Sequence, residues 1–287
     1  MTNQNYCHLS VDLEDYKDAT MRDVGVPPRV SPESTRRGVE TILSVLERVP
    51  GSRRLTFFTT GQVARGQSDL VRSLSDGGHE IACHGDLHEN VWDLDQSRFE
   101  KIVQRAVKSL EDASGRRISG FRAPNFSFDD RCPWMHQILG EAGFSYDSSL
   151  VQSKSREREA IYDVVRLPEG AIFEIPIYQH PVAFGLGVRV IGGTYFRLLP
   201  VRVILNLFRK SDAMGYAPII YLHPSDLADR FVPVQMGEME GLSVFSRLKW
   251  RIRQAQWSLG TRWAAEKLAA VLREFPNKGP LNGVLPG

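Results

Sequence analysis

Residues 54–83, RLTFFTTGQVARGQSDLVRSLSDGGHEIAC, decide the fold class that we predict for this chain. The apolar run at 54–61 is typical of a buried strand, and so is HEIAC at 79–83. Between these runs, residues 67–78 predict a short helix that ends at Gly77 and Gly78. Two short strands joined by a helix predict a β/α unit with parallel strands.

The same alternation continues on both sides of this unit. HLSVDL at 8–13 predicts a first strand, and a helix follows with Ser31 as its N-cap. A longer amphipathic helix is predicted from 95 to 110, before the strand GFRA at 120–123. Short strands then dominate to about residue 195, and PIIYL at 218–222 predicts a late strand. We therefore expect an α/β protein built on a largely parallel sheet.

The composition fits a soluble globular protein. Of the 287 residues, 42% are hydrophobic and 24% are charged, and 36 basic against 34 acidic residues give a net charge of +2. This balance implies no general attraction to nucleic acid. The three cysteines include no C-x-x-C pair, which argues against a disulfide framework and a cysteine-rich zinc site. The first residues lack the pattern of an export signal, so we expect a cytoplasmic location.

One stretch near the C-terminus, residues 246–267, mixes arginine, lysine and tryptophan at near-helical spacing. We expect a single helix here with a solvated basic face. Its packing residues should be Leu248, Ile252, Trp257 and Trp263. Contact with an anionic membrane surface or a phosphorylated ligand is the alternative.

Four chemically complementary residues lie at or just beyond the ends of predicted strands: Asp12, His84, Arg122 and His223. Parallel α/β folds build their sites at this edge of the sheet, from loops that converge there. We therefore treat the four residues as candidates for one site.

A histidine pair with H-x3-H spacing, His84 and His88, suits a single divalent ion, although two solvated loop histidines would show the same pattern. A carboxylate must complete such a site, and VDLEDY at 11–16 offers three. Strand alternation places Asp12 and Glu14 on one face, so one could accept a proton while the other binds metal. Asp15 could also turn inward.

Four ordered stretches carry a family resemblance: SVDLEDY at 10–16, HEIACHGDLHE at 79–89, GFRAPNFSF at 120–128 and YLHPSDL at 221–227. They closely resemble the motifs of the polysaccharide deacetylases of carbohydrate esterase family 4, which are related to the chitooligosaccharide deacetylases. Further stretches, YDSSL, RLPEGAIFEIPI and GGTYFRLLP, look like the branch encoded in bacterial exopolysaccharide and O-antigen gene clusters. The resemblance covers roughly residues 8–230.

The resemblance implies a distorted (β/α)7-type barrel and metal-dependent hydrolysis of an N-acetyl group on an amino sugar. By position, Asp12 matches the general base, and His84 and His88 match the metal-binding histidines. Arg122 matches the arginine that braces the base, and His223 matches the general acid. The barrel domain would span residues 1–235, with a helical extension and a flexible tail over 236–287.

Two positions depart from the family pattern. The adjacent aspartates of the usual first motif are replaced by D-L-E-D, which leads us to Glu14 as the metal carboxylate, with Asp15 second. Gly85 stands where Ser or Thr usually follows the first histidine. We expect one divalent ion, Zn²⁺ before Co²⁺, Ni²⁺ or Fe²⁺. A backbone N–H near Asn125 would stabilise the oxyanion, and Tyr195 would either contact the sugar or pack in the core.

The resulting hypothesis is a cytoplasmic deacetylase of surface-polysaccharide synthesis, in lipopolysaccharide or exopolysaccharide pathways. Its substrate would be an N-acetylated nucleotide sugar or a lipid-linked glycan, and the basic helix would suit peripheral contact with the inner membrane face. A deformylase or a non-sugar amide hydrolase is an alternative on the same fold. A catalytically silent glycan-binding protein is another. The sugar and the oligomeric state stay open.

Overall fold

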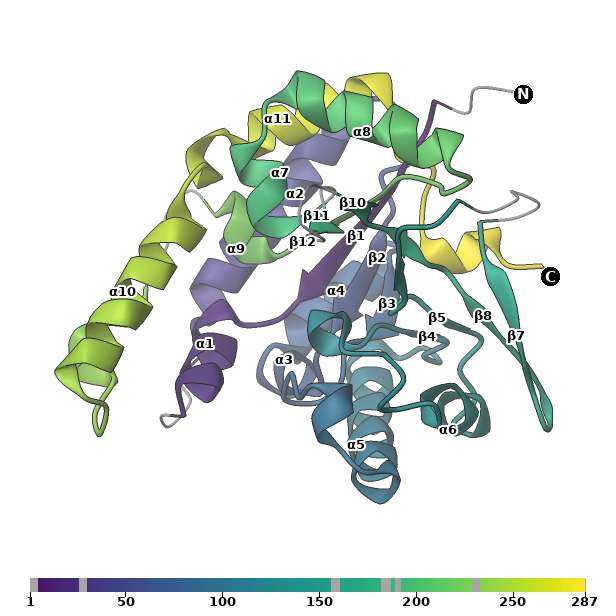
Figure 1. The fold of residues 1–287 in the computed structure, drawn as a ribbon, viewed down its shortest axis with the longest axis horizontal. Helices are drawn as coiled ribbons and strands as arrows, with labels where there is room; N and C mark the ends of the chain where they lie inside the picture. The colour runs from purple at the N-terminus through teal and green to yellow at the C-terminus, as the bar shows by residue number, and fades with distance from the viewer. Residues whose placement is uncertain are drawn as a thin grey trace.

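A buried sheet of eight strands organises the computed structural model of this protein (Figure 1). The structure describes residues 5–25, 30–155, 161–181, 187–188, 192–228 and 233–286. In the order in which they lie across the sheet, the strands are β12 (Ile219–Leu222), β1 (His8–Leu13), β2 (Thr56–Thr59), β3 (Glu80–Cys83), β4 (Gly120–Phe121), β5 (Tyr146–Asp147), β8 (Gly170–Glu174) and β7 (Asp163–Leu167). All neighbours are parallel except β7 and β8, which are antiparallel.

Helices connect and cover these strands. They are α1 (Tyr16–Val24), α2 (Pro32–Glu47), α3 (Gly61–Gly66), α4 (Ser68–Asp76), α5 (Gln96–Ser114), α6 (Met135–Glu141), α7 (Gly193–Leu198), α8 (Val201–Ala213), α9 (Pro224–Leu227), α10 (Val244–Ser258) and α11 (Thr261–Glu274). Two further strand pairs, β6 (Val151–Gln152) with β9 (Ile177–Tyr178) and β10 (His180–Pro181) with β11 (Gly187–Val188), lie outside the main sheet. In the described part of the chain, no helix is both long and apolar enough to cross a membrane.

The sheet is an open, curled half-barrel, with β12 and β7 at its two edges. The predicted α/β architecture of barrel type is confirmed. Its core forms as the sequence pattern predicts, because α5 buries a helical stripe that includes Phe99, Val103, Ala106 and Leu110. All three cysteines are buried and unpaired.

Strand register brings the predicted site residues to one edge. Leu13 pairs with Thr59, Thr59 with Cys83, and Cys83 with Phe121. The next residues along β1, β3 and β4 therefore leave the sheet at the same level. On the other side of β1, Val11 pairs with Leu222, which places the residue after β12 beside them.

The C-terminal helical region differs from the prediction in two ways. It forms two helices, α10 and α11, because Gly260 between them adopts a left-handed φ of 82°. Three of the expected packing residues are exposed, Leu248 by 52%, Ile252 by 54% and Trp263 by 59%. The Trp257 side chain lies outside the described residues. The face that packs carries Trp250 and Gln254 instead.

Residues 276–282, part of the tail predicted to be flexible, lie against the start of the sheet. Asn277 is buried, accepts a hydrogen bond from Leu9 N and donates to the carbonyls of Ser52 and Arg54. Leu281 is fully buried. Its proline and glycine content is typical of a loose segment, but its hydrogen bonds are made to residues far away in sequence.

Candidate active site

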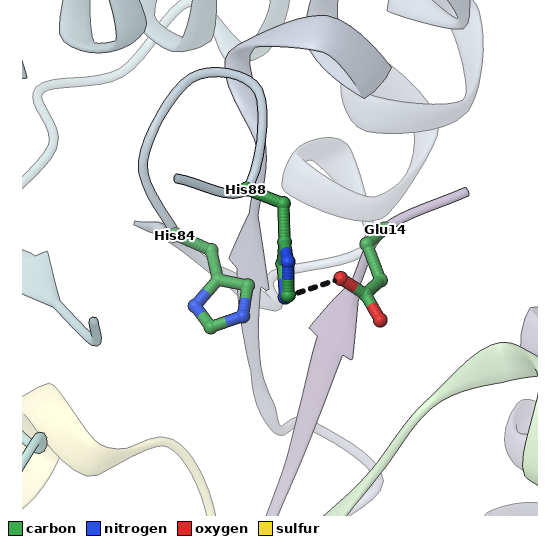
Figure 2. A group of neighbouring side chains, drawn as sticks. All are labelled: Glu14, His84 and His88. Atoms are coloured by element: carbon green, nitrogen blue, oxygen red, sulfur yellow. Dashed lines mark ion pairs between the residues drawn. The ribbon is translucent and has the colours of Figure 1, made fainter. Parts of the chain in front are cut away.

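Glu14, His84 and His88 converge at the carboxyl edge of the sheet (Figure 2). Glu14 follows β1, and both histidines come from the loop after β3. One ligand atom of each residue lies within 4.8 Å of the other two, and His88 Nε2 is 2.7 Å from Glu14 Oε2. Two imidazoles and one carboxylate form a donor set that divalent zinc and similar ions prefer.

The ring of His84 is oriented by a backbone contact. His84 is buried, and its Nδ1 lies 2.8 Å from the carbonyl oxygen of Arg122, which can only accept a hydrogen bond. Nδ1 therefore carries the proton, and Nε2 keeps a lone pair for a ligand bond. Burial lowers the pKa of His84 to about 4, so this ring is neutral at physiological pH. A neutral imidazole with a fixed orientation is suited to act as a metal ligand.

Glu14 is held in the charged state that a ligand needs. Burial disfavours its ionised form, but the neighbouring His88, His223 and His84 outweigh this effect and lower the pKa of Glu14 to about 2. Asp15, the second candidate carboxylate, turns away from this cluster. It is the N-cap of α1 and accepts hydrogen bonds from the backbone N–H groups of Asp18 and Ser31. The geometry therefore favours Glu14.

The loop that carries the two histidines has an unusual backbone conformation and is held in place by ion pairs. Gly85 has a φ of 71°, a left-handed conformation that explains glycine at this position. His88 also has a positive φ of 64°, which is uncommon for a residue with a side chain. Between them, the buried Asp86 binds Arg65 of α3 and Arg105 of α5 at 2.6 Å each. Asp86 was not among the predicted site residues, although its place between the two histidines was a signal.

Asp12 and Arg122 form a buried ion pair beside this cluster. Arg122 Nη1 lies 2.8 Å from Asp12 Oδ1, and Arg122 is fully buried. The guanidinium also donates to Ser10 Oγ and Ser148 Oγ, and it lies 3.9 Å from the centre of the Phe58 ring. Arg122 is therefore fixed from several sides, and it fixes the orientation of the Asp12 carboxylate in turn.

His223 is the N-cap of α9 and faces Glu14, with 3.6 Å between His223 Nε2 and Glu14 Oε1. Its Nδ1 lies 3.2 Å from Asp226 Oδ2. Burial alone would lower the pKa of His223, but the hydrogen bond with Asp226 and the charges of Glu14 and Asp12 raise it to about 10. His223 is therefore protonated at neutral pH and can donate a proton.

Asp226 is itself held by the buried Arg197, whose Nε lies 2.7 Å from Asp226 Oδ1. Arg197 also donates to Thr194 Oγ1 and to the carbonyl of Leu259. Neither Asp226 nor Arg197 was among the predicted site residues. The i, i+3 spacing of His223 and Asp226 at the start of a helix was the available signal.

A cavity of about 210 Å³ opens onto these groups and is lined by Glu14, His88, His223, α1, α7 and α9. Asn125 lies on its wall and has a positive φ of 56°. Tyr195 is 43% exposed on α7 and is not part of this lining, although its neighbours Gly193 and Thr194 are. The structure thus brings together every predicted site residue except Tyr195.

A second buried cluster lies at the β5–β8 side of the sheet. His136 Nε2 is 3.2 Å from Asp147 Oδ2 and 3.1 Å from Glu174 Oε2. Leu150 N donates to Glu174, and Ser149 Oγ donates to Asp147 at 2.5 Å. Burial opposes the charged His136, but the two carboxylates outweigh it and raise its pKa to about 10. Each carboxylate oxygen has a hydrogen-bond or ion-pair partner within the protein. We therefore interpret this cluster as an internal structural brace.

The chain is thus an α/β protein of the curled half-barrel class with a two-histidine, one-carboxylate cluster at its carboxyl edge. Residues 32–146 match the polysaccharide deacetylase family model, and residues 147–275 match the model of a domain of unknown function, DUF3473. Over residues 32–146 the chain is therefore similar to the polysaccharide deacetylases.

Two curated relatives share part of the sequence. A peptidoglycan deacetylase-like protein, FGM2, from Gibberella zeae is 33% identical over 115 residues, which are 40% of this chain and 33% of that protein. A peptidoglycan deacetylase from Helicobacter pylori is 29% identical over 98 residues, which are 34% of this chain and 32% of that protein. The matched part of this chain therefore spans about a third of the length of each relative.

Solved structures share the fold over nearly the whole chain. A protein described as a polysaccharide deacetylase from Mycobacterium smegmatis aligns over 97% of this chain and 95% of its own, with a TM-score of 0.52 and 22% identity. A family 4 pseudoenzyme from Bacillus anthracis aligns over 100% of this chain and 67% of its own, with a TM-score of 0.50 and 12% identity. The shared fold therefore does not decide whether a member is active.

Proposed function

We propose that this protein is a metal-dependent N-deacetylase that removes the acetyl group from an amino sugar of a bacterial surface glycan. One observation carries the proposal. The Glu14, His84 and His88 cluster lies at the same sheet edge as the buried Asp12–Arg122 pair and the protonated His223. A ligand set, a base and an acid are the groups that amide hydrolysis requires.

The donor set fits a divalent ion, Zn²⁺ or alternatively Co²⁺, Ni²⁺ or Fe²⁺. Glu14, His84 and His88 would hold it, because His84 Nε2 is left free by the Nδ1 contact and Glu14 is ionised. When bound, the ion supplies a Lewis acid that polarises the acyl group.

The remaining chemistry belongs to side chains of this protein. Asp12, oriented by Arg122, accepts the proton of the attacking water. A backbone N–H near Asn125 stabilises the negative charge that develops on the acyl oxygen when water adds to the acyl carbon. His223 protonates the departing amine, which is a poor leaving group without a proton. The products are acetate and the free amino sugar.

The cavity limits the substrate class. At about 210 Å³ it is small beside the roughly 300–1,000 Å³ of pockets for drug-sized ligands. It suits the N-acyl group and part of one sugar ring, with the rest of the substrate outside. We propose an N-acetylated nucleotide sugar or lipid-linked glycan of O-antigen or exopolysaccharide synthesis, by the resemblance of residues 146–150, 166–177 and 192–200. We further propose that the protein acts in the cytoplasm.

The test is acetate release from N-acetylated sugars by the zinc-loaded protein. Chitooligosaccharides and an N-acetylated nucleotide sugar are the first substrates, with N-formylated analogues beside them. We expect acetate from wild type and none above background from His84→Ala. Formate without acetate would replace the proposal by the deformylase alternative. Glycan binding without release of either acid would replace it by the silent glycan-binding alternative.

A further inference from the structure

Helix α10 exposes an apolar stripe. Phe245 is 78% exposed, Leu248 52%, Ile252 54% and Leu259, just after the helix, 54%. Their spacing of three, four and seven residues places them on one face of the helix. Val244, 75% exposed, extends the stripe at the N-terminal end. Contiguous exposed apolar side chains of this kind mark interaction surfaces.

The opposite face of α10 is firmly packed, so the stripe is not the result of a helix detached from the protein. Trp250 packs against the buried cluster of Met21, Val234 and Met239. Gln254 is buried, accepts a hydrogen bond from Val234 N and donates to Val234 O. Figure 1 shows α10 at the left edge of the molecule, beside α1 and away from the sheet.

The charge of α10 points to an anionic partner. Its sequence, VFSRLKWRIRQAQWS, has four basic residues and no acidic one. By helical spacing, Lys249 and Arg253 flank the apolar stripe on one side, and Arg247 and Arg251 flank it on the other. A second copy of the chain would bring two such basic helices together, so repulsion disfavours self-association through this face.

An apolar stripe bordered by basic side chains is the pattern of a helix that lies in the interface of an anionic bilayer. We propose that α10 docks this protein on an anionic lipid surface. Phe245, Leu248 and Ile252 enter the boundary between headgroups and acyl chains, and the exposed Lys249 and Arg253 contact lipid phosphates.

Docking through α10 would hold the cavity near the lipid surface. The corner after α10 is bonded to the cavity wall, because the Leu259 carbonyl accepts from Arg197, which binds Asp226. On the other side, the α10 cluster includes Met21 of α1, whose Tyr16 and Thr20 line the cavity. If the proposed function holds, the lipid surface is where the glycan substrate is presented. The docking itself does not depend on that function.

The experiment is sedimentation of the full chain with vesicles. One preparation contains phosphatidylglycerol with phosphatidylcholine, and the other contains phosphatidylcholine alone. We expect binding to the first, weakened by added salt, and much weaker binding to the second. Phe245→Ser with Leu248→Ser should lower the partition coefficient by at least about tenfold. Lys249→Gln with Arg253→Gln should lower it roughly tenfold.

Matched controls lie elsewhere on the surface. Val164→Ser removes an apolar side chain that is 53% exposed on β7, and Arg98→Gln with Lys101→Gln removes two charges from the exposed face of α5. These variants should bind vesicles as wild type does. All variants are compared by circular dichroism melting, so that misfolding is not mistaken for lost docking.

Two results would overturn the proposal. One is failure of wild type to bind anionic vesicles. The other is a dimer in solution that the Phe245→Ser and Leu248→Ser variant breaks while vesicle binding persists, which would assign the stripe to a second copy. Acetate release from a soluble sugar, measured on the same variants, should be unchanged. If wild type released no acetate, the proposed function would be refuted, but the docking result would not be affected.

Discussion

At the scale of single residues, the function depends on how firmly each charged group is held. Arg122 has no exposure and contacts Asp12, Ser10 and Ser148, so it has no freedom to rotate away. A base held in one orientation needs no reorganisation when it takes the proton of the attacking water. The Asp12 carboxylate should therefore matter for rate more than for stability of the site.

Asp12→Asn tests this role. We expect kcat for acetate release to fall by about 10²–10⁴-fold, the usual contribution of a positioned general base. The metal content should stay that of wild type, because Asp12 is not in the Glu14, His84 and His88 cluster. Steady-state kinetics and elemental analysis on the same preparation measure both. Unchanged kcat would refute Asp12 as the base.

The sequence placed Glu14 before Asp15 as the metal carboxylate only through the family resemblance, and the residues themselves left both open. Both carboxylates follow the same strand, and spacing alone allows either to face the histidines. The choice is made by α1, since Asp15 caps its first turn through the N–H of Asp18. The helix was not predicted, so its cap could not be recognised.

At the scale of elements, the loop between β3 and α5 holds both histidines in place through its backbone shape. Gly85 has a φ of 71°, and an added Cβ would lie 3.3 Å from Pro124 Cγ. Glycine suits this turn at a position where the motifs that the sequence resembles usually have Ser or Thr. The loop should be sensitive to side chains at this position.

Gly85→Ala should lower the free energy of unfolding by about 1–2 kcal/mol, the cost of a left-handed conformation for a residue with Cβ. Gly66→Ala is the matched control, because its Cβ would meet nothing within 4 Å. It should be neutral or stabilise by up to about 1 kcal/mol. Urea denaturation compares the two. Equal effects would show that the Gly85 backbone conformation is not required.

The His136 brace makes stability depend on pH. The pKa of His136 is raised from 6.5 to about 10 by Asp147 and Glu174, against the opposing effect of burial. A raised folded-state pKa contributes stability that is fully present below pH 6.5 and is lost as the pH rises through about 10.

His136→Gln should therefore be less stable than wild type at pH 6.5, and the difference should shrink toward pH 10. Urea midpoints across this range measure it. A difference that grows with pH would mean that His136 is neutral in the folded protein.

The strands and the long helices were predicted correctly because apolar periodicity in the sequence indicates directly which side chains are buried. The packing of the C-terminal region was not predicted correctly. Its tryptophan, leucine and isoleucine residues predicted a packed helix, yet Leu248 and Ile252 are more than half exposed. Apolar periodicity says that a face is amphipathic, but it does not say which partner covers the face.

At the scale of the whole molecule, one sheet and one site are built from both matched segments and from the residues before them, which supply β1, Asp12 and Glu14. β3 and β4 belong to the segment at 32–146, whereas β8, β7 and β12 belong to the segment at 147–275. His84 and His88 come from the first segment, and His223 comes from the second. The site therefore requires both segments and the N-terminal strand β1 folded together.

The C-terminal tail closes the opposite end of the sheet. Asn277→Ala should lower the free energy of unfolding by on the order of 3 kcal/mol, because it leaves the buried N–H of Leu9 and the Ser52 and Arg54 carbonyls without their partner. Asn206→Ala on the exposed face of α8 should stay within about 0.5 kcal/mol of wild type. Chemical denaturation of both variants checks this. Equal stabilities would mean that the tail is loosely held after all.

The most direct test of the central claim is the divalent metal content of the purified protein, measured by elemental analysis after loading with zinc. Wild type and Asp15→Asn, which can still cap α1, should each hold about one ion per chain. His84→Ala and Glu14→Gln should lose it. A wild type that binds no zinc, or a loss in Asp15→Asn with retention in Glu14→Gln, would contradict the metal centre described here.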